Sequence, residues 1–199
     1  MVGHSHGGAL VRLFAHPYRD QVTGMVLVDS TEEIVASDAP LQDAIKTQLA
    51  SLKVKESESL FGITRFRMRS DPLLAAAFSP PACVAETSDE SRSMLAIRAE
   101  MEGPGGPGTL GNLPLVIISR GEPVDEAPPG LWSAQFEQGW RTAQERLAKL
   151  SSNSELVVAK QSSHNVQLSQ PELVVDEINL VVAAVREHVP LSQSRGTSE

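Results

Sequence analysis

The feature that most constrains this chain of 199 residues is a glycine-framed serine close to its start, because residues 3–7 read Gly-His-Ser-His-Gly. The pattern G-x-S-x-G is typical of a serine held on a sharp turn between a β-strand and an α-helix, where the backbone adopts angles that few non-glycine residues accept. Such a turn needs small neighbours, and Gly3, Gly7 and then Gly8 supply them. The motif therefore predicts a strand, a turn that carries Ser5, and a helix.

The residues that follow fit this prediction. Leu10, Leu13 and Phe14 have the spacing of one face of an amphipathic helix, and Pro17 ends the pattern. Residues 22–28 (Val-Thr-Gly-Met-Val-Leu-Val) then form a nearly continuous apolar run. A run of this kind is typical of a strand that is buried on both faces of a parallel sheet.

Strand and helix patterns alternate again in the last third of the chain. Residues 114–119 and 155–159 are apolar strands, residues 131–150 form a helix that separates them, and Pro171 opens a terminal helix. This alternation predicts an α/β fold with a mostly parallel sheet of about four strands flanked by helices.

The middle of the chain differs from both ends. Helical patterns fill residues 31–112 up to the glycine- and proline-rich run at 103–108, which we interpret as a linker back to the sheet. We therefore expect a helical cap at 31–112 between core segments at 1–30 and 113–191. The polar tail at 192–199 is expected to be disordered.

The composition excludes several classes of function. A formal net charge of −8 without a long basic cluster argues against nucleic acid as a partner. No stretch has the length and apolarity of a membrane-spanning helix. The single cysteine, Cys83, cannot form an intramolecular disulfide; the compartment is undetermined, with the cytoplasm favoured over secretion.

The motif at 3–7, the strand ending at Val28 and a histidine seven residues before Pro171 together resemble the C-terminal half of the α/β-hydrolase superfamily. The similarity is greatest to its lipase and esterase branch. Ser5 stands where some other branches carry an aspartate, which favours acyl chemistry. The resemblance implies a serine hydrolase with no cofactor and no metal, acting on a small-molecule carboxylic ester or related acyl compound.

A serine hydroxyl is a poor nucleophile at neutral pH, so a base must take its proton. His164 lies in a loop after the last expected strand, where the resemblance places that base. His4 and His6 flank the serine, but we expect their side chains to point elsewhere. As a metal site, this histidine pair lacks a third ligand.

Two positions compete for the acid that orients the base. Asp29 ends the buried strand at 22–28, whereas the loop at 120–126 offers Glu122 or Asp125 at the position that family members usually use. We favour Asp29, because Asp125 lies in an acidic, proline-flanked loop. A carboxylate at the end of a strand can also serve only to cap the next helix.

The resemblance also implies an oxyanion hole with two backbone N–H donors. One comes from His6, the residue after the serine, and the other from a loop that precedes the serine strand in the family. We therefore expect this chain to be the C-terminal part of a longer enzyme. By itself it should expose a sheet edge, self-associate and show little activity; the alternatives are a ligand-binding pseudoenzyme and an inactive truncated product.

Overall fold

The computed structural model describes residues 1–30, 108–123 and 134–196, together with residues 54, 57–61, 63, 66, 80, 89, 93, 97, 100 and 101. The chain divides into two compact units, one formed by Met1–Ala36 with Glu100–Glu199 and the other by Ser37–Ala99. Residues 57–60 of the second unit are helical. Most of the cap expected at 31–112 lies outside the described residues.

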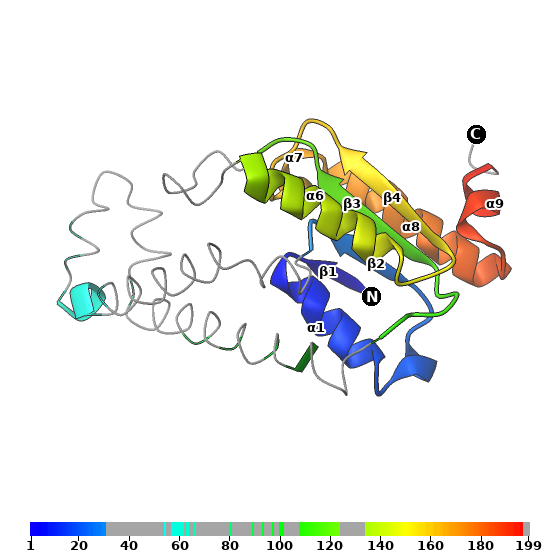
Figure 1. Cartoon of the computed structure of the whole chain (residues 1–199), viewed down its shortest axis with the longest axis horizontal. Helices are drawn as coiled ribbons and strands as arrows, with labels where there is room; N and C mark the ends of the chain where they lie inside the picture. The colour runs from blue at the N-terminus through cyan, green and yellow to red at the C-terminus, as the bar shows by residue number, and fades with distance from the viewer. Residues whose placement is uncertain are drawn as a thin grey trace. The chain divides into compact units, whose positions relative to one another are not determined.

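The first unit contains a parallel sheet of four strands, ordered β1 (Val2–His4), β2 (Met25–Val28), β3 (Leu115–Arg120) and β4 (Ser154–Ala159) (Figure 1). Val26 lies opposite Val2 on one side and Val116 on the other. The predicted α/β architecture with a four-stranded parallel sheet is therefore confirmed. Because neighbouring strands run the same way, all four carboxyl ends meet at one edge of the sheet.

Helices connect and cover these strands. They are α1 (His6–Ala15), α6 (Ala134–Ala148), α7 (Val166–Ser169), α8 (Pro171–Glu187) and α9 (Leu191–Gly196), with one 3₁₀ turn at Arg19–Gln21. Figure 1 shows α6 in front of β3 and α8 behind the sheet. Pro171 occupies the first turn of α8, where its missing N–H removes no helical hydrogen bond.

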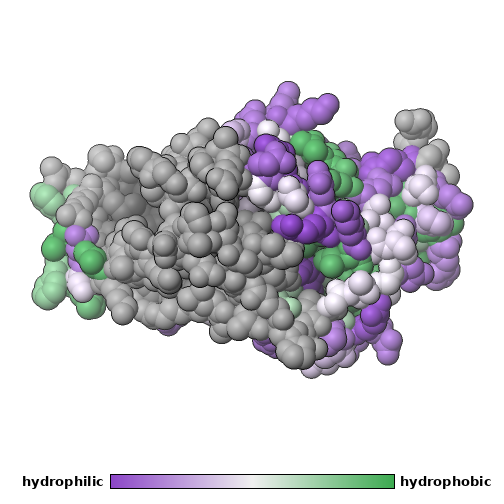
Figure 2. Space-filling model, in the orientation of Figure 1, coloured by the Kyte–Doolittle hydropathy of each residue, from purple (hydrophilic) through white to green (hydrophobic). Residues whose placement is uncertain are grey.

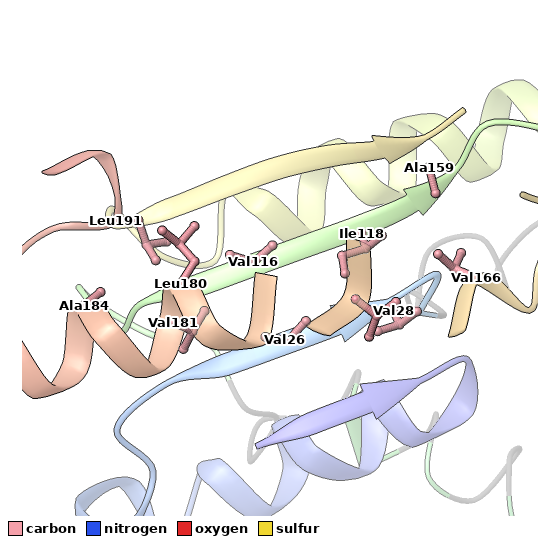
Figure 3. Packing of buried hydrophobic residues seen from close by; sticks show 11 residues of the cluster. Val26, Val28, Val116, Ile118, Ala159, Val166, Leu180, Val181, Ala184 and Leu191 are labelled. Carbon is pink, nitrogen blue, oxygen red and sulfur yellow. The ribbon is translucent and has the colours of Figure 1, made fainter. Parts of the chain in front are cut away.

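Side chains of the central strands alternate between two buried cores. Val26, Val116 and Ile118 face α8, where they pack against Val181 and Ala184 (Figure 3). The residues between them in sequence, Met25, Leu27, Leu115 and Ile117, face the other side and pack with Ala15 of α1 and Leu147 of α6. Burial on both faces explains why residues 25–28 and 115–118 are all apolar.

Helix α1 packs through a different face from the one that the sequence pattern predicts. Its buried residues are Gly8, Ala9, Arg12 and Ala15. Leu10 and Phe14 are 46% and 40% exposed, and Val2 on the edge strand β1 is 48% exposed. The helix lies so close to the sheet that only small residues fit along most of the contact, so the apolar stripe points outward. Apolar side chains therefore remain exposed at the β1 edge.

The expectation of a disordered tail is wrong for residues 192–196, which belong to α9. Leu191 is 1% exposed and belongs to the core between the sheet and α8. Arg195 donates hydrogen bonds to Glu177 and Glu155. The tail is polar because it docks through ion pairs instead of an apolar stripe. Figure 2 shows hydrophobic and hydrophilic residues interspersed over the described part of one face of the molecule.

Gly8 offers a direct test of this close packing. A Cβ atom built on Gly8 would lie 1.7 Å from Ser30 Oγ and 2.5 Å from Ser30 Cβ, so Gly8→Ala forces α1 away from the sheet. We expect it to lower the free energy of unfolding by about 1–3 kcal/mol, measured by urea denaturation. The control is Gly139→Ala in α6, where no described atom lies within 4 Å of the new Cβ; it should stabilise the fold by about 0.5–1 kcal/mol. Equal effects of the two variants would contradict the packing argument.

Candidate active site

Ser5 is the single residue between strand β1 and helix α1, and its backbone carries the strain expected of such a turn. It has φ 53° and ψ −124°, in a region that L-residues rarely adopt. The Ser5 N–H donates to Val28 O at 3.0 Å, and Ser30 Oγ donates to Ser5 O at 3.1 Å. A Cβ on Gly3 would lie 2.6 Å from Gly7 O, so glycine is required there. Among the described atoms, none crowds Gly7 in this way.

His164 lies in the loop between β4 and α7, and backbone hydrogen bonds fix this loop against β3. The carbonyl of Ser162 accepts from the N–H groups of Gly121 and Glu122 at 3.1 and 3.0 Å. The His164 carbonyl lies 2.9 Å from His4 Nε2. These contacts place the imidazole at the carboxyl edge of the sheet.

Three side chains that follow three different strands meet at this edge. Ser5 Oγ lies 2.9 Å from His164 Nε2, although 159 residues separate the two in sequence. On the other side of the ring, His164 Nδ1 lies 2.7 Å from Asp29 Oδ2. A carboxylate can only accept, so Nδ1 carries the proton in the neutral ring and Nε2 is left to accept from the serine hydroxyl. The row is therefore suited to moving a proton from Ser5 to His164.

The carboxylate of Asp29 is fully buried and held on both oxygens. Trp140 Nε1 and the Arg120 backbone N–H donate to Oδ1 at 2.8 and 3.1 Å, and Arg120 Nη1 donates to Oδ2 at 2.9 Å. Burial alone raises the pKa of Asp29, but the hydrogen bond from His164 and the charge of Arg120, with the help of Trp140, outweigh it and lower the pKa below its ordinary value. Asp29 is therefore ionised at neutral pH.

This lowered pKa also ties the stability of the fold to pH. The ionised carboxylate contributes its full stabilisation above the ordinary aspartate pKa of 3.8. The contribution is lost as the pH falls through the lower pKa of the folded state, because protonation then removes the favoured charged form.

His4 does not point away from the site as expected. Its ring centroid lies 4.7 Å from that of His164, and its Nε2 must carry a proton because its partner is the His164 carbonyl. Burial lowers the pKa of His4, and the hydrogen bond to that carbonyl opposes the shift only in part. His4 is therefore a neutral donor that ties the end of β1 to the His164 loop.

Three other residues were singled out from the sequence, namely His6, Glu122 and Asp125. His6 begins α1, so its backbone N–H belongs to the positive end of the helix dipole. Glu122 is exposed, and its described hydrogen bond is made by its backbone N–H to Ser162. Asp125 lies outside the described residues.

Neither Arg120 nor Trp140 was identified from the sequence as part of the site. One signal was present, because Arg120 is a charged residue at the end of an otherwise apolar strand. Nothing in the local sequence distinguishes Trp140 from a core residue, since its partner Asp29 is 111 residues away.

The part of the chain that the structure describes offers neither a metal cluster nor a membrane span. Within it, His, Cys, Asp and Glu side chains nowhere gather in a group of three that could hold a metal ion. No helix among these residues combines the length and the apolarity needed to cross a membrane.

Comparisons with known proteins give a consistent result. A family model described as "Alpha/beta hydrolase family" matches residues 1–177. The uncharacterized protein YqjL of Bacillus subtilis (strain 168) is 33% identical over 86 residues, which are 43% of this chain and 31% of YqjL.

Two solved structures share the fold. One is MGS-M2, an alpha/beta hydrolase enzyme from a deep-sea metagenome library of the Medee basin, with a TM-score of 0.58, 19% identity and coverage of 89% of this chain and 64% of that one. The other is Est816, described as an N-acyl homoserine lactone degrading enzyme, with a TM-score of 0.51, 15% identity and coverage of 89% and 65%. The chain thus spans less than two thirds of the length of each of these three proteins.

Proposed function

This chain belongs to the alpha/beta hydrolase family, and on that basis we propose that it is a serine hydrolase that cleaves carboxylic esters or related acyl compounds. The observation that carries the proposal is the row of hydrogen bonds from Ser5 Oγ through His164 to Asp29 Oδ2. A buried, ionised carboxylate at the end of such a row orients the imidazole and stabilises its positive form.

The proposed reaction has two halves. Ser5 Oγ attacks the acyl carbon while its proton passes to His164 Nε2, and the tetrahedral intermediate collapses when His164 gives that proton to the departing alcohol. A water molecule then attacks the acyl-serine, with His164 again taking and returning the proton. The products are a carboxylic acid and free Ser5, and Asp29 stays ionised throughout.

The negative oxygen of the tetrahedral intermediate needs donors of its own. We assign one of them to the backbone N–H of His6, because it lies next to Ser5 at the positive end of α1. We propose that the second comes from the remainder of a longer protein. Two observations support this: the chain spans 64% and 65% of the two structural relatives, and apolar Val2 is exposed on the edge strand. The same edge would promote self-association of the chain alone.

A fluorophosphonate probe tests the nucleophile directly, because it labels an activated serine in one step and needs no turnover. We expect a single phosphonyl adduct on the peptide that contains Ser5, detected by mass spectrometry. Labelling should be lost in Ser5→Ala and strongly slowed in His164→Ala, because the serine hydroxyl then lacks its base. The matched control is Ser192→Ala, at an exposed position of α9, which should label like the unchanged chain.

The outcomes of this experiment separate the hypotheses. Labelling that persists in Ser5→Ala would refute the nucleophile assignment. Silence of this chain together with labelling of a longer chain would identify truncation as the cause of inactivity, and silence of both would favour a ligand-binding pseudoenzyme. Substrate tests should include lactones, which are cyclic esters, because Est816 is described as an N-acyl homoserine lactone degrading enzyme.

A further inference from the structure

The Asp29 carboxylate accepts more hydrogen bonds than proton transfer between Ser5 and His164 requires. Two donors contact Oδ1, namely Trp140 Nε1 and the Arg120 N–H, and two contact Oδ2, namely Arg120 Nη1 and His164 Nδ1. The side chains of Arg120 and Asp29 are only 2% and 0% exposed. Both oxygens of the acid are thus saturated in a site from which water is largely excluded.

Arg120 is itself held from two further directions. Its Nη2 donates to both oxygens of Glu137, at 3.0 and 3.2 Å, and its guanidinium carbon lies 4.4 Å from the centroid of the Trp140 ring. The Trp140 ring in turn meets the His164 ring edge to face, at 84° and 6.1 Å. A guanidinium fork with two carboxylate partners and an aromatic face leaves Arg120 little freedom to rotate.

From this geometry we infer that Arg120 and Trp140 are positioning residues that fix the rotation of the Asp29 carboxylate, so that Oδ2 faces His164 Nδ1. The inference rests on the serine hydrolase function proposed above. The described side-chain hydrogen bonds of the two residues go to Asp29 and Glu137, so both act through Asp29.

A carboxylate needs such a device because the torsion that turns it has a broad, roughly two-fold preference. A single bond from His164 would leave the other oxygen without a partner and the group able to turn. The Trp140 N–H donates to Oδ1, and Arg120 bridges both oxygens from its backbone and its side chain. The two residues together select one orientation.

Charge acts in the same direction as geometry. Among the residues that the structure describes, the charged and titratable groups around Asp29 are His164 and Arg120 in direct contact, His4 beyond His164, and Glu137 beyond Arg120. Although burial raises the pKa of Asp29, His164 and Arg120 help to lower it overall. Removal of the Arg120 charge should therefore allow Asp29 to take up a proton at higher pH.

The mildest test is Trp140→Phe, which removes one N–H donor and keeps a ring beneath Arg120. Arg120→Met removes the charge and the side-chain bond to Oδ2 but keeps the backbone N–H that donates to Oδ1. Arg120→Lys restores the charge without the fork geometry. The matched control is Arg195→Met, which also breaks ion pairs of an arginine, with Glu155 and Glu177, but leaves the surroundings of Asp29 unchanged.

The first readout is the proton between His164 Nδ1 and Asp29, observed by NMR in the ¹⁵N-histidine-labelled chain. We expect its resonance to shift and to exchange faster with water in Trp140→Phe and Arg120→Met, and to stay unchanged in Arg195→Met. This readout does not depend on catalysis, so it decides the inference even if the chain hydrolyses no ester.

The second readout is kinetic. We expect kcat to fall about 10-fold in Trp140→Phe and about 100-fold in Arg120→Met, with KM changed less than about twofold. The acidic limb of the activity profile should move to higher pH in Arg120→Met and recover in part in Arg120→Lys. If the NMR resonance and the pH profile of both Trp140→Phe and Arg120→Met match the unchanged chain while only Tm falls, the two residues are merely structural and the inference is wrong. Failure of Ser5 to label in both this chain and a longer one would instead refute the proposed function.

Discussion

Replacement of Ser5 or His164 by alanine should lower kcat for ester hydrolysis by about 10⁴-fold or more in the active protein, with the double variant scarcely worse than either single one. The reason is that the two groups act as one unit: without the base the hydroxyl is not activated, and without the hydroxyl the base has no proton to take. Their 2.9 Å separation is the structural basis of this expectation. The measurement is kcat and KM with an activated ester for both single variants and the double variant.

Two controls make this result interpretable. Ser192→Ala should keep full activity, and the melting temperature of each variant should show that the fold is intact. Losses that multiply in the double variant would mean that Ser5 and His164 contribute independently, which a nucleophile and its base cannot do.

The second large effect concerns the acid. Asp29→Asn should lower kcat by about 10³- to 10⁴-fold, because the amide cannot hold the His164 tautomer whose Nδ1 donates or stabilise the imidazolium. It should leave KM nearly unchanged, since Asp29 is buried behind His164. Asp125→Asn should stay within about threefold of the unchanged protein, as expected for an uninvolved loop carboxylate.

These two aspartate variants are matched controls for each other, because both remove one negative charge and keep the shape of the side chain. If Asp125→Asn loses its activity while Asp29→Asn stays active, the acid is Asp125, at the position that is usual in the family. The contacts with Arg120 and Trp140 would then give Asp29 a purely structural role.

The core of the fold could be predicted from sequence because its signals are local. An uninterrupted apolar run such as 25–28 specifies a doubly buried strand, and a glycine-framed serine specifies the strand, turn and helix around it. The outward face of α1 could not be predicted, since only the contact of Gly8 with Ser30 shows how closely this helix lies against the sheet. Helix α9 escaped prediction because ion pairs of Arg195 hold it.

The site could be predicted only in part, because local motifs can be recognised in the sequence and contacts between distant residues cannot. Ser5 belongs to a motif and His164 to a recognisable loop, whereas the contacts of Asp29 depend on which strands are neighbours. Arg120 and Trp140 are 91 and 111 residues from Asp29 in the sequence. Arg120 meets Asp29 because β3 pairs with β2, and Trp140 meets it because α6 packs against the sheet. The sequence could rank Asp29 above Asp125, and the role of the acid stays a prediction.

The central claim, that Ser5 is a nucleophile that carries the acyl group, is tested most directly by trapping the intermediate. The active protein would be mixed with an activated acetate ester, quenched with acid within the first turnovers and digested for mass spectrometry. We predict one acetyl group on Ser5, absent in Ser5→Ala and barely detectable in His164→Ala. Ester hydrolysis at full rate with no acetyl on Ser5, or with the acetyl on another residue, would contradict the account.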